Sequence, residues 1–231
     1  MSYLFDAPPV NSIPVACETA SYPIHRIFCV GRNYAAHALE MGNEVDREEP
    51  FYFTKSAQHA LSSGQTVPFP PGTADYHHEM ELVFVLGASV FRADAEAART
   101  AIFAYGCGLD MTRRDLQQKG KDKRRPWDLG KDVENTAVFA ELTPAAQFGE
   151  ISNQRIHLAV NGDIRQDATL AEMIHSVTDI VVDLSKYYHL HAGDVIMTGT
   201  PAGVGAVQAG DVITGGIDGL APISLTLGAA E

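Results

Sequence analysis

The stretch YHHEMELVFVLG, residues 76–87, joins two carboxylates to an almost uninterrupted apolar run. Side chains two positions apart in a β-strand point to the same face, so Glu79 and Glu81 project together. The residues that follow are apolar on both faces, which is typical of a strand covered on both sides. The pattern therefore predicts a buried strand over residues 79–87 that carries two acids at its start.

Two neighbouring carboxylates in a buried strand repel each other and lose hydration, which is costly unless something compensates. A shared proton, a basic partner or a cation would do so, and a hard divalent cation prefers oxygen ligands. Asp110 ends another apolar run, YGCGL, and could supply a third oxygen. No cysteine or closely spaced histidine set completes a tetrahedral zinc site. The alternative is an edge strand that exposes both acids to solvent.

The segment GRNYAAHALEMG, residues 31–42, follows a short apolar strand and predicts a helix from Asn33, as its cap, to about Met41. His37 and Glu40 are three residues apart and would share one face of that helix. A carboxylate bound to one imidazole nitrogen raises the basicity of the other, and such a pair can take a proton from water. The alternative is an ordinary solvated helix face.

Several residues further along the chain suit an anionic ligand. Arg114 and Gln117 share a face of a predicted helix over residues 112–119, and with Lys131 they could hold a carboxylate or an oxyanion. Thr200 lies in a glycine-rich turn, TGTPAGVG, that exposes backbone N–H groups. Each also has a plain structural interpretation as a surface lysine, a local salt bridge or a tight turn. The basic block KGKDKRRP is either a solvated loop or a mobile lid.

The overall charge excludes some classes of protein. The chain has 231 residues, with 17 Lys and Arg against 29 Asp and Glu, and a net charge of −12. Such a balance argues against binding to nucleic acid or to an anionic membrane surface. No apolar run approaches the ~20 residues of a membrane span, and the first residues do not resemble a secretory signal. Three sparse cysteines fit reduced thiols in the cytoplasm.

The remaining pattern predicts an N-terminal arm over residues 1–23 and a single catalytic domain over residues 24–231. The domain should be of the α+β class, with a β-rich second half. The other elements expected are a strand over 51–55, a loop over 68–72, a helix over 94–105 capped by Asp94, a hairpin at Asn161-Gly162-Asp163, a helical region over 169–190, and short strands in DVIMTG, DVITGG and ISLTL.

Five motifs occur in one order along the chain: CVGRNYAAHALEMG, YHHEMELVFVLG, GLDMTRRDLQ, RPWDLGKD and MTGTPAGVG. In sequence and rough spacing this set resembles the fumarylacetoacetate hydrolase family, over about residues 24–228. The resemblance implies a mixed β-sandwich or roll with flanking helices, a homodimer, and one Mg²⁺ or Mn²⁺ per subunit. Two departures are Ser56, where relatives usually have proline, and the unusually basic loop before Pro126.

The resemblance also implies roles for individual residues. Glu79, Glu81 and Asp110 would hold the metal, His37 and Glu40 would activate water, and Lys131 would stabilise an oxyanion. Arg114, Gln117 and Thr200 match positions that contact the substrate.

The activity implied is hydrolysis of the C–C bond of a 1,3-diketo acid. The motifs are most like those of the short bacterial members that act on acylpyruvates, so fumarylpyruvate, cleaved to fumarate and pyruvate in gentisate-type aromatic catabolism, is the expected substrate. The alternatives on the same scaffold are oxaloacetate decarboxylation and the isomerisation or decarboxylation of a hydroxymuconate-type acid, which need no activated water. A non-catalytic protein that binds a metal or an acid would need neither the His37–Glu40 pair nor Lys131.

Overall fold

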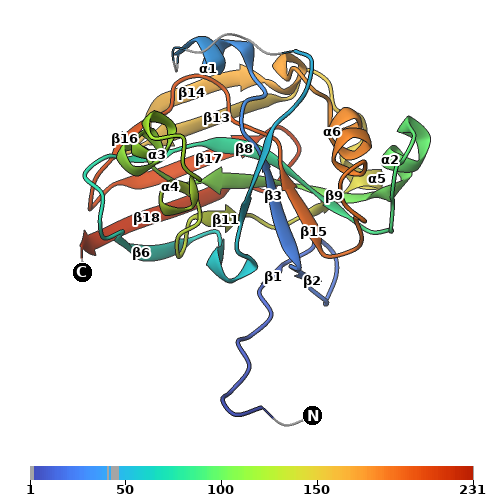
Figure 1. Cartoon of the computed structure of the whole chain (residues 1–231), viewed down its shortest axis with the longest axis horizontal. Helices are drawn as coiled ribbons and strands as arrows, with labels where there is room; N and C mark the ends of the chain where they lie inside the picture. The colour runs from blue at the N-terminus through green and yellow to red at the C-terminus, as the bar shows by residue number, and fades with distance from the viewer. Residues whose placement is uncertain (1–2, 41, 43–46, 231) are drawn as a thin grey trace.

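The computed structural model describes residues 3–40, 42 and 47–230, which form two packed β-sheets with a few helices at their margins (Figure 1). The larger sheet has the order β4-β3-β15-β8-β9-β11-β5, with β12 paired to β9. Its strands are β3 (Arg26–Val30), β4 (Tyr52–Lys55), β5 (Ala60–Ser62), β8 (Met80–Leu86), β9 (Ile102–Asp110), β11 (Ala137–Phe139), β12 (Thr143–Pro144) and β15 (Asp194–Met197).

The second main sheet packs on the centre of the first, where β13, β17 and β18 contact β8 and β9. Its order is β14-β13-β17-β18-β6. These strands are β6 (Gln65–Phe69), β13 (Arg155–Val160), β14 (Asp163–Thr169), β17 (Val212–Ile217) and β18 (Ile223–Ala230). Two small sheets complete the β structure: β10 (Thr112–Arg113), β7 (Tyr76–His78) and β16 (Gly205–Val207), and the pair β1 (Ser12–Ile13) and β2 (Tyr22–Pro23).

The helices are short and lie around the sheets, which agrees with the predicted β-rich α+β fold with flanking helices. They are α1 (Ala35–Glu40), α2 (Ala95–Ala101), α3 (Arg114–Asp122), α4 (Asp128–Lys131), α5 (Ala145–Phe148) and α6 (Val177–Leu184), with 3-10 turns η1 (Ala57–His59) and η2 (Leu170–Glu172). Among the described residues, none of these helices has the length and apolar character needed to cross a membrane.

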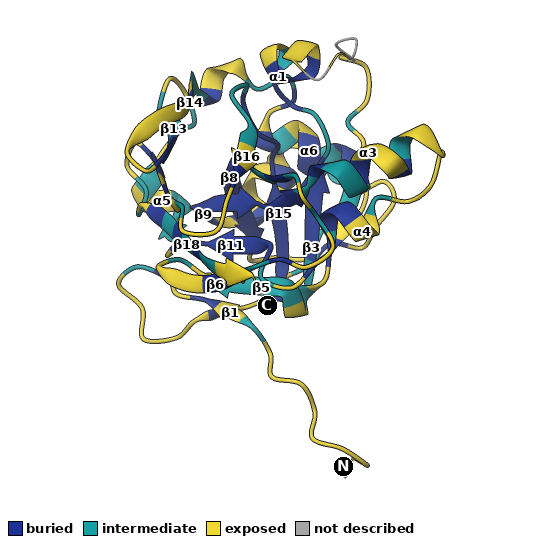
Figure 2. Cartoon of the chain, turned by 90° about the vertical axis from the view of Figure 1, so that its left-hand side faces the viewer, coloured by how far each residue is buried: buried dark blue, intermediate teal, exposed yellow. Residues whose placement is uncertain are grey.

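Strand β8 lies at the centre of the molecule, and all of its residues are buried (Figure 2). Leu82 and Phe84 belong to the core between the two main sheets. Val83 and Val85 belong to a second core on the other face, which the N-terminal segment closes. Full burial of each such side chain contributes about 1.5–3 kcal/mol. The buried character predicted for this strand is therefore confirmed, and the edge-strand alternative is wrong.

Three strands leave the large sheet at one place and continue in the small sheet β10-β7-β16. The first passes from β7 to β8 across Glu79, so the predicted strand begins one residue later than expected. The second passes from β9 to β10 across Met111, and the third from β15 to β16 across residues 198–204. The acids at the ends of β8 and β9 thus meet at a junction of two sheets.

Two predicted helices differ from the observed ones. Asn33 does not cap α1, because its buried side chain bonds the backbone N and O of His175 at 2.7 and 2.9 Å; the expected end at Met41 lies outside the described residues. Asp94 does cap α2 and accepts from Ala97 N at 2.8 Å. That helix ends at Ala101. Residues 102–105 include a β-branched side chain and two aromatic ones, which favour a strand, and they pair with β8 as the start of β9.

Two further predictions were wrong in extent. The helical region over residues 169–190 is divided into η2 and α6, and the segment between them pairs through Met173 with Tyr34. The predicted loop over residues 68–72 begins later, because Pro68 belongs to β6. A proline is tolerated there because β6 is an edge strand. The predicted hairpin at Asn161-Gly162-Asp163 is confirmed.

The N-terminal segment has two parts with different environments. Tyr3, Leu4 and Phe5 are exposed and extend away from the sheets (Figure 1). Ile13 and Val15, by contrast, are buried in the second core. The predicted arm therefore contributes apolar side chains to the body of the molecule through its later residues.

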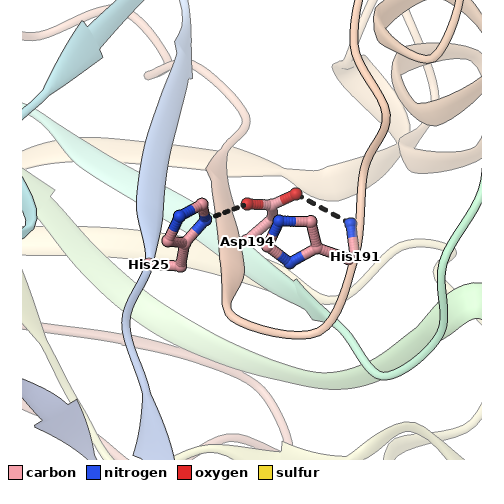
Figure 3. Close-up of side chains that lie close together, drawn as sticks. All are labelled: His25, His191 and Asp194. Carbon is pink, nitrogen blue, oxygen red and sulfur yellow. Dashed lines mark hydrogen bonds and ion pairs between the residues drawn. The ribbon is translucent and has the colours of Figure 1, made fainter.

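The carboxylate of Asp194 joins the starts of β3 and β15. It is fully buried and accepts hydrogen bonds from Arg26 Nε at 2.8 Å and Nη2 at 2.6 Å. It also accepts from the backbone N of His191 at 2.9 Å, and His25 Nδ1 lies 3.6 Å from it (Figure 3). His25, His191 and Asp194 are residue types that bind metals, but both oxygens of Asp194 already accept hydrogen bonds from the Arg26 guanidinium. We interpret the group as a structural clamp.

The clamp predicts a stability effect for Asp194→Asn. The amide keeps the shape but removes the charge and one acceptor facing Arg26, so we expect the free energy of unfolding to fall by about 2–3 kcal/mol. Urea denaturation followed by circular dichroism measures this. The control is Asp167→Asn, which removes an exposed partner of Arg155 and should leave the midpoint unchanged. An unchanged midpoint for Asp194→Asn would contradict the interpretation.

Candidate active site

Three buried carboxylates meet where the strands change sheets. Glu79 precedes β8, Glu81 lies within it, and Asp110 ends β9; their exposed fractions are 4%, 1% and 0%. The backbone N of Asp110 donates to Glu79 O at 2.9 Å, which fixes the two strand ends together. One oxygen from each carboxylate lies within 4.8 Å of the others. The structure therefore brings together the three acids singled out in the sequence.

The ammonium of Lys131 lies among these acids. Its Nζ donates to Glu79 Oε2 at 2.7 Å, to Asp110 Oδ2 at 2.6 Å and to the Thr112 hydroxyl at 2.8 Å. Lys131 ends the short helix α4 and is buried, so the surface-lysine alternative is wrong. A positive charge bound by two of the three carboxylates shows that the centre accepts a cation.

A second buried lysine, Lys55, contacts Asp110. Its Nζ donates to Thr136 Oγ1 at 3.0 Å and to the backbone oxygens of Met111, at 3.2 Å, and Lys131. Asp110 Oδ1 is 2.9 Å from that ammonium, yet it lacks a hydrogen bond of good geometry within the described residues. We interpret the contact as an ion pair whose protons point elsewhere, which leaves this oxygen free to accept a further bond.

Arg114 closes another side of the group. Its guanidinium donates to Glu79 Oε1 and, at 2.7 Å, to Gln117 Oε1. Arg114 and Gln117 are both buried and lie one turn apart on α3, as their spacing predicted. The salt bridge of Arg114 is thus with Glu79, 35 residues away in sequence, so the structural alternative of a local salt bridge is wrong.

The two glutamates have opposite pKa shifts. Burial would raise the pKa of Glu79, but the positive charges of Lys131 and Arg114 outweigh it and hold that pKa well below its ordinary value. Burial and the negative charges of Asp110 and Glu79 raise the pKa of Glu81 well above its ordinary value. Glu81 accepts a hydrogen bond from Gly199 N at 2.7 Å. This bond lowers the pKa of Glu81 and offsets only part of the rise. Its ionisation at neutral pH therefore calls for a further positive charge beside it.

These observations fit a hard divalent cation. Carboxylate oxygens are the donors that Mg²⁺ and Mn²⁺ prefer, the centre already holds an ammonium, and Asp110 Oδ1 has an unused lone pair. The raised pKa of Glu81 points the same way, because a cation beside this carboxyl would favour its ionised form. The three acids are therefore suited to hold such an ion.

Helix α1 presents His37 toward the same centre. His37 is buried, and its Nδ1 lies 3.4 Å from Glu40 Oε2. Burial lowers the pKa of His37, and the negative charges of Glu79 and Glu40 restore only part of the loss. The imidazole is thus neutral, and able to accept a proton, down to a lower pH than usual. The solvated-face alternative holds for Glu40, which is half-exposed, and is wrong for His37.

Thr200 occupies the third strand crossing. Its hydroxyl donates to Met80 O at 2.8 Å and accepts from Gln166 Nε2 at 2.7 Å. Gln166, on β14, is fully buried and also bonds Pro201 O and Met80 N. The Thr200 hydroxyl therefore joins the turn to β8 as a structural bond.

Sequence reasoning missed Lys55, Gln166 and the backbone donors that hold the acids. Lys55 gave one usable signal, a lysine that ends an apolar strand, FYFTK. Gln166 gave none, since most residues of its strand are polar and most are exposed. The Gly199 and Gly203 amides bond Glu81 and Glu40 through contacts more than 100 residues apart in sequence, which no local pattern reveals.

Comparison with known proteins agrees with this geometry. The family described as "Fumarylacetoacetate (FAA) hydrolase C-terminal" matches residues 26–227. A fumarylpyruvate hydrolase of a Ralstonia species is 51% identical over 193 residues, covering 83% of this chain and 100% of the relative. An oxaloacetate tautomerase of Escherichia coli is 42% identical over 199 residues, covering 86% of this chain and 90% of the relative.

Solved structures agree as well. The crystal structure of fumarylpyruvate hydrolase from Pseudomonas aeruginosa in complex with Mn²⁺ and pyruvate has a TM-score of 0.94 and 39% sequence identity, and the match covers 99% of this chain and 100% of that chain. The order of motifs, the sheets that they occupy and these matches lead to one conclusion: the chain belongs to the fumarylacetoacetate hydrolase family.

Proposed function

We propose that the protein is a metal-dependent hydrolase that cleaves the C–C bond of an acylpyruvate, with fumarylpyruvate as its substrate and fumarate and pyruvate as products. The observation that carries the proposal is the joint presence of three buried carboxylates, an ammonium among them, and a buried histidine paired with a glutamate. The relative of 51% identity, a fumarylpyruvate hydrolase, supports it.

Glu79, Glu81 and Asp110 are the residues that would hold one Mg²⁺ or Mn²⁺ per subunit. When bound, such an ion supplies Lewis-acid catalysis and a template for the substrate's oxygens. The Mn²⁺ in the related Pseudomonas aeruginosa structure supports this assignment. Arg114 and Gln117 would bind the substrate's carboxylate. Thr200 would lie in the turn that borders this carboxylate.

Hydrolysis then follows from the chain's own residues. His37, oriented by Glu40, accepts a proton from a water molecule, and the resulting hydroxide attacks the carbonyl carbon of the acyl group. Lys131 stabilises the negative charge that develops on the carbonyl oxygen. The C–C bond breaks and its electron pair passes to the pyruvate enolate, which takes up at carbon the proton that His37 removed from water. The acyl group leaves as a carboxylic acid and releases its own proton to solvent.

The setting proposed for this reaction is the cytoplasm, in gentisate-type catabolism of aromatic compounds, with a homodimer as the working unit. Exposed aromatic side chains away from the centre, among them Phe91 and Phe103, suit such an interface. A small anionic substrate fits a centre that carries Lys131 and Arg114 within an acidic chain.

A second candidate is oxaloacetate chemistry, tautomerisation or decarboxylation, which the 42% identity to the Escherichia coli tautomerase favours; a hydroxymuconate-type isomerisation belongs to the same class. These reactions need a stabilised enolate but no hydroxide. The paired His37 and Glu40 therefore favour hydrolysis.

The proposal predicts that the purified protein with Mn²⁺ or Mg²⁺ releases pyruvate from fumarylpyruvate, followed with lactate dehydrogenase and NADH. EDTA should abolish the release and added metal should restore it, because the acids alone supply no Lewis acid. Oxaloacetate serves as the competing substrate. Pyruvate release from oxaloacetate but from no acylpyruvate would overturn the hydrolase proposal in favour of the second candidate.

Two variants should separate metal binding from proton transfer. Asp110→Asn removes one anionic ligand, so we expect loss of both Mn²⁺ affinity, measured by isothermal titration calorimetry, and activity. His37→Ala should bind Mn²⁺ as the wild type does, yet lose about 10²–10⁴-fold in kcat, the usual contribution of a general base. Unaltered Mn²⁺ affinity in Asp110→Asn would contradict the ligand assignment.

The lowered pKa of His37 predicts the acid limb of the pH profile. Since the base must be unprotonated, activity is lost as pH falls through that pKa, and the limb of kcat/KM should lie below about 6.5, the ordinary histidine value. In Glu40→Gln a charge that raises this pKa is gone, so the limb should move to still lower pH while kcat falls. A limb that moves upward in Glu40→Gln would contradict the pairing.

A further inference from the structure

A strip of three aromatic rings extends from the buried centre toward the basic block. The ring of Phe53 lies 6.0 Å from that of Trp127, and Phe51 meets Trp127 edge-on at 5.6 Å. Phe53 is half-buried, whereas Phe51 reaches solvent. The strip thus forms an apolar path from the interior to the surface.

Each ring of this aromatic strip carries a positive group. Lys131 Nζ lies 4.9 Å from the Phe53 ring, Lys121 Nζ 5.0 Å from the Trp127 ring, and Arg32 Cζ 5.3 Å from the Phe51 ring. Such cation–π contacts fix the direction of a side chain as well as attracting its charge. The inner cation belongs to the centre described above, and the outer two stand at the end of the strip.

The strip also borders a cavity of ≈ 340 Å³. Its walls include the rings of Phe51, Phe53 and Trp127 together with charged residues of both signs, Arg125, Lys131 and Asp128. Lys121 and Arg32 do not line it, and they contact the Trp127 and Phe51 rings that do. Flat aromatic walls suit the unsaturated carbons of a planar chain.

The ammonium of Lys121 is itself in a positive environment. The pKa of Lys121 is lowered to about 8, first by burial and then by the positive charges of Arg114 and Arg32, with Glu79 offsetting only part. An anion bound beside Lys121 would favour its charged form. The geometry and the charge therefore call for the same kind of ligand group.

We propose that Lys121, with Arg32 beside it, binds the carboxylate at the far end of the acyl chain, while the aromatic strip holds the unsaturated carbons between. The inference rests on the proposed function. It assigns a binding residue to the acyl end of the substrate, which the buried carboxylates and Lys131 do not contact in the proposed mechanism. A fumaryl group is planar, apolar in its middle and charged at its end, which matches the order of groups along the strip. Lys121 is thereby a determinant of specificity for dicarboxylic acylpyruvates.

The test compares two substrates that differ only at that end. Crotonylpyruvate carries a methyl group where fumarylpyruvate carries its terminal carboxylate. For Lys121→Met we expect kcat/KM for fumarylpyruvate to fall about 10- to 100-fold, the loss expected for one charge-assisted hydrogen bond. The value for crotonylpyruvate should stay within about twofold, since a missing contact changes nothing for a substrate that never made it.

Two further variants serve as matched controls. Lys123→Met removes the same charge from an exposed position two residues further along, just after the end of α3, and should leave both substrates unaffected, which excludes a general field effect. Lys121→Arg keeps the charge and should retain most of the preference. Equal losses on both substrates in Lys121→Met, or no loss on either, would overturn the proposal.

Product binding separates this inference from the proposed function. Calorimetric titration of the Mn²⁺-loaded protein with fumarate and with crotonate needs no turnover. We expect the wild type to prefer fumarate and Lys121→Met to bind the two equally. A preference that persists in Lys121→Met would overturn the role of Lys121, whereas absence of pyruvate release from every acylpyruvate would overturn the hydrolase proposal alone.

Discussion

The site depends on the balance of buried charge at the place where the sheets meet. Three carboxylates lie there with less than 5% of their surface exposed, and three cations, Lys55, Lys131 and Arg114, bind two of them, Glu79 and Asp110, directly. Removal of one partner from such a group leaves a charge without solvation and is strongly destabilising. The residues are therefore coupled, and the position of the Lys131 ammonium depends on the groups that hold the acids in place.

Backbone geometry supplies much of that hold. The passage of three strands from one sheet to another brings the ends of β8, β9 and β15 to one place without any long loop. The amide of Asp110 bonds Glu79 O, and the amide of Gly199 bonds the Glu81 carboxylate. These bonds tie the acids to the backbone, so the separation of the acids is set by the fold and not by side-chain preference.

The features that could be predicted from the sequence are those encoded by strand alternation and by residues a few positions apart. The buried strand with Glu79 and Glu81 on one face, the Asp94 cap and the turn at Asn161-Gly162 each depend on neighbours in sequence, and each is present. The helix predicted through residue 105 failed because pairing with β8 overrode local preference. Lys55 was missed as a partner of Asp110 because the two are joined only through the tertiary fold.

The proposed base shows the same dependence on distant parts of the chain. Both oxygens of Glu40 accept from Gly203 N at 3.1 Å, so a turn 163 residues away holds the carboxylate that orients His37. Gly203 has φ +94°, and a Cβ there would lie 2.0 Å from Arg165 O, so another residue would force the turn away from β14. A glycine distant in sequence thus fixes the carboxylate that lies 3.4 Å from His37 Nδ1. A short helix such as α1 gains little from its own backbone bonds, and its alignment over the acids follows from this docking.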